Sequence, residues 1–563
     1  MTTTLTASDL LVAALENEGV ERIFGLPGEE NLDLLEAIRR SSIELILTRH
    51  EQAAAFMAAT HGRLSGRPGV CLTTLGPGAL NLSTGAAYAL LGAMPMIMIT
   101  GQKGILTAAQ ARFQIVDTIA AMTPVTKMTK QIISPPTIPT VIREAFRVAQ
   151  SERPGPVHLE LPEDIAAATA PQVDLIEPTP AILPTASPDA IAAAIDVISG
   201  AKRPLIMLGA AAARPRCTHA LSGFIARMRI PFFTTQMGKG TVSGCTDLYL
   251  GTAALTGGDY LHEAIDQADV IITIGHDTVE KPPFTMRAPV QTIVHLDYQP
   301  ATIEEVYVPQ IEVIGDLHHT LHALTDHLHG KVPHAQALLP MREGILAHVA
   351  DRATENRLTP QRIVHDVRQI MPDEGIVALD NGMYKVWFAR NYRTTTANTL
   401  LLDNALATMG AGLPSAIVAS LLHPDRRVMA VCGDGGFMMN SQELETAVRL
   451  GLDLVLVILD DHGYGMIRWK QAVDGFTDYG MTFHNPDFVA YAKAYGATGT
   501  HVAAASQLGP ALERAFDNGG VQLVHVPVDY SENTRVLIDE LQHSSTTPWG
   551  GSEESSPTPE TVR

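Results

Sequence analysis

Short, continuously apolar runs recur along the whole chain, and a stretch with helical periodicity separates each run from the next. Between residues 8 and 101 these runs are RIFG, IELILT, GVCLTT and MPMIMITG. Strands that are apolar on both faces are typical of parallel sheets covered by helices on each side. The same alternation returns after residue 203 and again after residue 375. The sequence therefore predicts an α/β protein with three doubly wound parallel-sheet domains.

Length and local composition suggest where the domains divide. A chain of 563 residues exceeds what one hydrophobic core normally supports. The segment 171–188 is rich in Pro, Ala and Thr, a composition that is typical of a linker. We predict domains at residues 1–172, 186–335 and 356–541. The remaining residues, 542–563, lack apolar periodicity and are predicted to be a disordered tail.

Charge and hydropathy exclude several classes of protein. The formal net charge of −20 disfavours nucleic acid as a partner. The N-terminal stretch does not resemble a signal peptide, and the most apolar stretch is about a dozen residues, well below the roughly 20 that cross a membrane. The four cysteines are far apart in the chain and form no disulfide or metal-binding pattern. We therefore expect a cytoplasmic protein that binds neither membranes nor nucleic acid.

One predicted strand, VMAVCG, ends at an acid placed among glycines, in the sequence Gly433-Asp434-Gly435-Gly436. Ligands of open parallel sheets bind at the carboxyl ends of the strands. Bare glycine backbone can approach an anion such as a diphosphate, and Mg²⁺ can join a carboxylate to phosphate oxygens. Taken alone, the motif is more often a tight turn.

A second acidic motif strengthens the metal-binding interpretation. The run LVLVILDDHGYGM ends in Asp460-Asp461, and Asp461 lies 27 positions after Asp434. This separation accommodates one helix and one strand, so that a right-handed crossover would make the two strands neighbours. A solvated turn remains the alternative for the Asp pair alone. Together, the two motifs predict a metal site shared by Asp434 and Asp461.

These motifs are part of a longer series of sequence blocks. In order, the blocks are RIFGLPG, TRHEQAAAFMA, TLGPGALNL, FQIVDT, RPGPVHLELPEDI, TMGAGLPSAI, GDGGFMMNSQELETA and VPVDYSEN. From about residue 8 to residue 529, the chain resembles the acetolactate synthase (acetohydroxyacid synthase large subunit) branch of the thiamine diphosphate enzymes. The resemblance implies the thiamine diphosphate-binding fold, with thiamine diphosphate and Mg²⁺ as cofactors.

The resemblance also implies roles for individual residues around these cofactors. Mg²⁺ would be bound by Asp434, Asp461 and the carbonyl group of Gly463, although family members more often have Asn at the second position. The thiamine diphosphate contacts would come from Glu51, Gly382, Met383, Tyr384, Ala407, Met409, Asp434, Gly435, Gly436, Asp461, Gly463, Tyr464, Gly465 and Met466. Met383 and Tyr384 replace the Gln and His that are common in the biosynthetic enzymes.

Three residues are implied as catalytic. Glu51 occupies the position of the carboxylate that hydrogen bonds to the aminopyrimidine ring, although taken alone it could be a helix-start acid. Phe113 and Gln114 occupy positions that orient the substrate in related enzymes. Met409 would lie beneath the cofactor, and Ile467 would lie beside the acceptor. Ordinary packing is the alternative for each apolar member of this group.

The implied reaction is the synthesis of 2-acetolactate. Pyruvate would lose carbon dioxide, and the remaining hydroxyethyl group would join a second 2-oxo acid. Two departures favour the catabolic type: Glu163 replaces a typical Lys, and the stretch GHDTVEKPPFTMRAP lacks the flavin-associated motif of biosynthetic enzymes. FAD is possible at LIMLGAAAARPR but is not favoured. The product would serve branched-chain amino acid or acetoin metabolism.

Assembly also follows from the resemblance, because the family places the residues equivalent to Glu51 and Asp434 on different subunits. We therefore expect a homodimer or homotetramer with active sites between subunits. Within enzymes, the alternative is another thiamine-dependent carboligase or lyase, or a 2-oxo acid decarboxylase. From a different class, the alternative is a non-catalytic protein that retains the fold.

Overall fold

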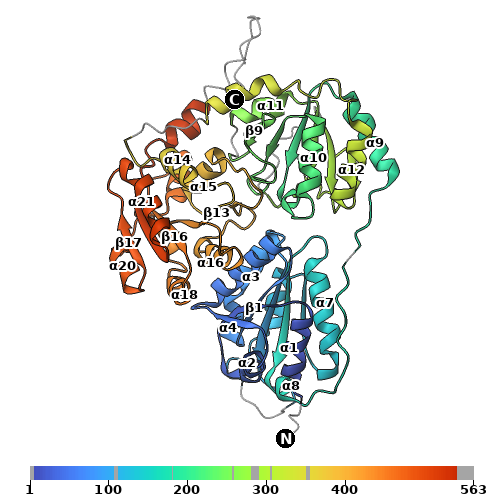
Figure 1. Cartoon of the computed structure of the whole chain (residues 1–563), viewed down its shortest axis with the longest axis vertical. Helices are drawn as coiled ribbons and strands as arrows, with labels where there is room; N and C mark the ends of the chain where they lie inside the picture. Colours follow the sequence, from blue (N-terminus) through green and yellow to red (C-terminus); the bar gives the residue numbers. More distant parts are fainter. Residues whose placement is uncertain are drawn as a thin grey trace, which may run out of the picture.

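The computed structural model describes residues 5–106, 112–180, 182–255, 259–280, 291–304, 307–349 and 356–541. The predicted tail at 542–563 lies outside these residues. The described chain forms three bodies, each built on a parallel sheet with helices packed on it (Figure 1). In these residues no helix is long and apolar enough to cross a membrane.

The N-terminal body contains a parallel sheet with the strand order β2-β1-β3-β4-β6-β5. The inner strands β3 and β4 are buried along their whole length, as expected from their continuous apolar sequence. The strands are β1 (Arg22–Gly25), β2 (Glu44–Leu47), β3 (Gly69–Thr73), β4 (Met96–Gln102), β5 (Met128–Gln131) and β6 (Pro156–Pro162). The helices are α1 (Ala7–Asn17), α2 (Leu32–Arg39), α3 (Glu51–Ser65), α4 (Gly76–Asn81), α5 (Ser83–Leu91), α6 (Thr118–Met122), α7 (Ile138–Gln150) and α8 (Glu163–Ala167).

The central body contains a sheet with the order β12-β11-β10-β7-β8-β9. Its strands are β7 (Pro204–Leu208), β8 (Phe232–Thr234), β9 (Tyr249–Thr252), β10 (Val270–Ile274), β11 (Thr292–Asp297) and β12 (Ile311–Ile314). Its helices, with the short helix that leads to the next body, are α9 (Pro188–Gly200), α10 (Thr218–Met228), α11 (Tyr260–Gln267), α12 (Leu317–Leu328) and α13 (Arg342–Ala347).

The C-terminal body repeats the design with the order β14-β13-β15-β16-β18-β17. Its strands are β13 (Ile376–Leu379), β14 (Leu400–Leu401), β15 (Val428–Gly433), β16 (Leu454–Asp460), β17 (Thr498–His501) and β18 (Val521–Pro527). Its helices are α14 (Pro360–Ile370), α15 (Met383–Asn391), α16 (Gly412–Leu422), α17 (Asp434–Phe437), α18 (Glu443–Arg449), α19 (Gly465–Val473), α20 (Phe488–Ala494) and α21 (Ala505–Asn518).

The predicted fold class, three parallel sheets each covered by helices, is confirmed. Each sheet lies inside one of the three domains predicted from the sequence, and we propose those boundaries for the domains. The apolar runs did not identify β5, β9 and β17, which are all edge strands. Edge strands have one unpaired side and tolerate polar residues, so MTKQ and TGTH do not form continuous apolar runs.

The N-terminal and C-terminal bodies meet through α3 and α16, which lie side by side (Figure 1). The buried hydroxyl groups of Thr60 and Ser415 are hydrogen bonded across this contact at 2.9 Å. Arg63 also donates a hydrogen bond to the carbonyl group of Leu402 at 3.1 Å. At the N-terminal end of α3, where Glu51 begins the helix, Gln52 accepts a hydrogen bond from Asn440 at 3.0 Å, so this end also lies next to the C-terminal body.

Candidate active site

A cavity of about 300 Å³ lies at the carboxyl end of the third sheet, beyond β13, β15 and β16. Each cofactor residue predicted in the C-terminal domain lines it: Gly382, Met383, Tyr384, Ala407, Met409, Asp434, Gly435, Gly436, Asp461, Gly463, Tyr464, Gly465 and Met466. Ile467 and Trp469 from α19 also line it. The central body contributes Gln236, Ala254 and Leu255. Segments far apart in the sequence therefore form one wall.

Acidic residues converge where β15 and β16 end. The two strands pair in parallel, with Gly433 opposite Leu459, so that Asp434 and Asp460 lie at the same edge of the sheet. The amide group of Asn485 donates hydrogen bonds to Asp434 at 2.7 Å and to Asp460 at 2.9 Å. The prediction that these strands are neighbours is confirmed, and Asn485 connects their ends.

The carboxyl groups at this edge have shifted pKa values. Burial raises the pKa of Asp461 to about 7, and the nearby charge of Asp434 contributes to the rise. Burial also raises the pKa of Asp434. Burial opposes the ionisation of Asp460, but its hydrogen bonds with His525, with the N–H of His462 and with Asp434 together outweigh this effect and lower the pKa. Asp434, Asp460 and Asp461 therefore bring three carboxyl groups to one partly buried edge of the sheet, where a bound cation would stabilise their ionised forms.

Two glycines in the cavity wall leave no room for a side chain. A Cβ atom on Gly465 would lie 2.5 Å from Oδ2 of Asp461. A Cβ atom on Gly435 would lie 2.9 Å from the ring of Tyr464. Bare backbone therefore forms this part of the wall, and a large anionic ligand can approach it closely.

A strained segment brings Met409 into the wall. Ala407 has a φ of 54°, in the left-handed region that non-glycine residues rarely adopt. Its N–H donates a hydrogen bond to Oδ2 of the buried Asp403 at 2.8 Å. On the other side of Met409, the N–H of Gly410 donates to Asp380 at 2.9 Å, and the buried helix α16 begins at Gly412. Both carboxylates hold the strained backbone in place, and such strain is most often found at functional sites.

The predicted residues of the N-terminal body gather on α4. The amide group of Asn81, at the end of this helix, donates a hydrogen bond to Oε2 of Glu51 at 2.9 Å. A Cβ atom on Gly76, at its start, would lie 2.5 Å from the carbonyl oxygen of Gln114. Glu51 and Gln114 therefore contact opposite ends of one six-residue helix.

This N-terminal group does not join the cavity of its own chain. Among the described residues, the cavity lining contains neither Glu51 nor Phe113 nor Gln114. Phe113 is 69% exposed, although it is a large apolar side chain. The predicted site residues therefore form two separate groups within a single chain.

Sequence reasoning missed several residues that shape the cavity. Asn485 lies in a loop without a recognisable motif, and His525 interrupts a strand whose pattern indicates core. Gln236 reaches the cavity from the central body, where no sequence signal points to the third sheet. Lys385 was detectable in principle, because a lysine within the buried helix α15 requires polar partners: its Nζ donates to Asn381 at 2.6 Å.

Comparison with protein families gives three matches along the chain. Residues 5–121 match the thiamine pyrophosphate enzyme N-terminal TPP binding domain. Residues 191–324 match the thiamine pyrophosphate enzyme central domain, and residues 380–526 match the C-terminal TPP binding domain. The cavity lies almost wholly within the third match.

Similar proteins extend over nearly the full length. The chain is 35% identical to an acetolactate synthase of Bacillus subtilis (strain 168) over 547 residues, covering 95% of each chain. It is 35% identical to the catabolic acetolactate synthase of Raoultella terrigena, covering 94% of this chain and 96% of that protein. It is 32% identical to the acetolactate synthase isozyme 2 large subunit of Escherichia coli (strain K12), with the same coverage.

Proposed function

This chain belongs to the acetolactate synthase family of thiamine pyrophosphate enzymes, and we propose that it makes 2-acetolactate from two molecules of pyruvate. One pyruvate loses carbon dioxide, and its remaining two carbons join the carbonyl carbon of the second pyruvate. The observation that carries the proposal is the convergence of the glycine-flanked Asp434 and of Asp461 in one large cavity. Near full-length similarity to acetolactate synthases supports the choice of reaction.

The cavity fits a Mg²⁺ ion with a diphosphate. Asp434 and Asp461 offer carboxylate oxygens, and Gly463 offers a carbonyl oxygen. Among the described residues, Asp461 pairs only with Arg468, whose Nη1 lies 3.5 Å away, and Arg468 also pairs with Asp478 at 3.0 Å, so a metal ion could take up the remaining negative charge. Among the described residues, no cluster of three or more His, Cys, Asp or Glu side chains could hold a metal alone. A site with few protein ligands suits Mg²⁺, because this ion usually keeps water and phosphate oxygens among its ligands.

Thiamine diphosphate supplies, when bound, the carbon nucleophile that attacks a 2-oxo acid. The bare backbone beside Gly435 and Gly465 would contact its diphosphate, and Met409 would support its rings from below. Glu51 would hold the proton at the aminopyrimidine nitrogen, a role that requires a carboxylate. Phe113 and Gln114 would orient the substrate, while Ile467 and Trp469 would border the acceptor.

We propose that a second copy of the chain completes each site, as a homodimer or homotetramer. The two groups of site residues are separate within one chain, which supports a site built between copies. Large apolar side chains are exposed in both regions, including Leu106 and Phe113 in the N-terminal body and Phe476 and Tyr479 after α19. Exposed apolar side chains of this kind mark contact surfaces.

The catabolic, flavin-independent type is the finer form of the proposal, with a cytoplasmic location. Glu163 and the absence of the flavin-associated sequence motif support the catabolic type. The cysteines in the described residues are all free, which suits a reducing compartment. An active preparation without a flavin absorption spectrum would support this assignment.

The test is a product assay with the full-length protein, Mg²⁺, thiamine diphosphate and pyruvate. Acid treatment converts 2-acetolactate to acetoin, so acetoin that forms only after acidification supports the proposal. Acetaldehyde as the sole product would instead indicate a decarboxylase.

A substitution tests the role of Glu51. Glu51→Gln should lower the rate at least about 100-fold and leave cofactor binding measurable. Glu21→Gln removes a carboxylate that is 78% exposed and serves as the control, with an unchanged rate.

A further inference from the structure

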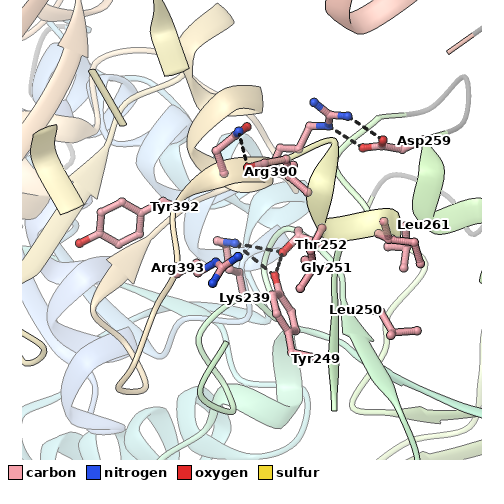
Figure 2. A pocket seen from close by; sticks show the side chains of 14 residues that line it. Lys239, Tyr249, Leu250, Gly251, Thr252, Asp259, Leu261, Arg390, Tyr392 and Arg393 are labelled. Carbon is pink, nitrogen blue, oxygen red and sulfur yellow. Dashed lines mark hydrogen bonds and ion pairs between the residues drawn. The ribbon is translucent and has the colours of Figure 1, made fainter. Parts of the chain in front are cut away.

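A second, much smaller cavity lies between the central and C-terminal bodies and shares no lining residue with the candidate active site (Figure 2). Its wall is formed by β9, by the start of α11 and by the end of α15, with Lys239 from the segment after β8. Its volume is about 20 Å³. A cavity of this size holds about one particle as large as a water molecule.

Lys239 is a buried cation with neutral partners. The residue is only 6% exposed, and its Nζ donates to Oγ1 of Thr252 at 3.1 Å and to Oη of Tyr249 at 3.4 Å (Figure 2). In the described part of the chain, Lys239 forms no ion pair. Buried lysines are almost always paired with an acid, because an uncompensated charge is costly to remove from water.

Arginines from the C-terminal body add positive charge to the same cavity. Arg390, which is 2% exposed in its side chain, uses Nε and Nη2 to hold both oxygens of Asp259 at 2.7 and 2.9 Å. Its Nη1 is buried and has no hydrogen-bond partner among the residues that the structure describes. Arg393 also lines the cavity and is exposed, so the cavity opens toward solvent at that side chain.

The charges in this cavity do not balance. Lys239, Arg390 and Arg393 bring three positive charges, while Asp259 is the one carboxylate among the described lining residues. Both oxygens of Asp259 are engaged by Arg390, so it offers little to Lys239. A water molecule would supply hydrogen-bond acceptors but no negative charge.

We propose that this cavity binds one small monovalent inorganic anion of halide size, with Lys239 as its main ligand. The volume excludes sulfate and phosphate, whose four oxygens need more room. Tyr249 and Thr252 present hydroxyl groups beside the Lys239 ammonium; these are hydrogen bonded to each other at 2.7 Å, so one of the two can still donate its proton to the anion. The bound anion would connect β9 of the central body with the end of α15 in the C-terminal body.

Bromide diffraction on crystals of the full-length protein is the direct test. Bromide scatters anomalously, so a peak beside Nζ of Lys239 is the expected result. Density for water alone at saturating bromide would overturn the proposal. This measurement needs no substitution and therefore does not depend on whether a variant folds.

Thermal unfolding at constant ionic strength provides a second test. Sodium chloride or bromide should raise the unfolding midpoint by a saturable amount of about 2 to 5 °C; sodium gluconate should not, and sodium sulfate should give only the gradual, non-saturating rise of an ion excluded from the protein surface. An equal rise with all four salts would overturn the proposal, because it would indicate a general salt effect.

Lys239→Met distinguishes an anion ligand from a structural lysine. This variant removes the buried charge and keeps an apolar side chain of similar length. It should lose the halide-dependent rise, and without halide its midpoint should equal or exceed that of the wild type. A lysine with only a structural role would give a lower midpoint in every salt. Lys331→Met, at an exposed position of the central body, is the control and should keep the full halide response.

Discussion

The hydroxyl group of Tyr384 accepts a hydrogen bond of 2.9 Å from the backbone N–H of Gly433. This bond joins the first turn of α15 to the end of β15, one residue before Asp434. Tyr384 is 2% exposed, so this hydrogen bond is shielded from water. Tyr384 therefore holds the strand end that carries the proposed metal ligand.

Tyr384→Phe should weaken cofactor binding more than it slows the chemical step. The variant leaves the N–H of Gly433 without its partner, which costs about 1–3 kcal/mol for a buried group. We expect thiamine diphosphate affinity to fall about fivefold or more, measured by titration calorimetry with Mg²⁺ present. Tyr260→Phe removes the hydroxyl of a half-buried tyrosine of the central body that does not line the candidate active site, and it should have no effect. Unchanged affinity in Tyr384→Phe would show that this hydrogen bond does not position the loop.

Asp461→Asn should change how Mg²⁺ binding depends on pH. Burial raises the pKa of Asp461 to about 7, so protons compete with the metal below that pH. In the wild type, Mg²⁺ affinity should fall by up to about tenfold for each pH unit below about 7. The amide of Asn does not titrate, so the variant should show a flatter dependence. Asp425→Asn, at an exposed position, should keep the wild-type slope; parallel slopes in all three proteins would contradict the prediction.

Glu443 should make the protein less stable as pH rises. Burial raises its pKa to about 7, although it accepts hydrogen bonds from the N–H of Arg49 at 3.0 Å and from Thr446 at 2.7 Å. Because the pKa of Glu443 is near 4.5 in the unfolded state, the folded state binds one more proton than the unfolded state between pH 4.5 and about pH 7. The contribution of Glu443 to the free energy of unfolding is therefore largest below pH 4.5. This contribution is lost as the pH rises to about 7, and the loss is on the order of 3 kcal/mol.

Glu443→Gln should remove this part of the pH dependence, because the amide stays neutral throughout. Thermal unfolding from acidic to slightly alkaline pH would measure it, and the variant should be the more stable protein above about pH 7. Glu374→Gln, at an exposed position, should follow the wild type. A variant whose midpoint falls with pH as steeply as the wild type would refute the assignment.

Two inactive variants should restore activity when they share a dimer. Glu51→Gln damages one group of site residues and Asp434→Asn damages the other. If each site uses one group from each copy, half of the mixed population is heterodimeric with one intact site, giving about a quarter of wild-type activity. Coexpression of the double variant with either single variant is the control and should remain inactive. Failure to recover activity would place both groups in one chain.

Periodicity in the sequence was sufficient to predict the fold class, because buried parallel strands must be apolar on both faces. MPMIMITG and LVLVILDD show this directly: β4 and β16 are buried from end to end. The same signal fails at β5 and β17, where one edge is free and polar residues are tolerated. The metal-ligand candidates were also predictable, because Asp434 and Asp461 follow two strands that a crossover must bring together.

Local sequence by itself determined which segments form strands, where the glycine-rich loops interrupt them, and that the acids after β15 and β16 lie at one edge of the sheet. The tertiary structure alone decided that Asn485 joins the ends of β15 and β16, that Tyr384 holds Gly433, and that Lys239 lies among neutral hydroxyls. The periodic pattern of apolar residues indicates which face of a helix or strand is buried, and that pattern is set by residues close together in the chain. Hydrogen-bond partners and charge balance depend on residues that only the packed bodies bring together.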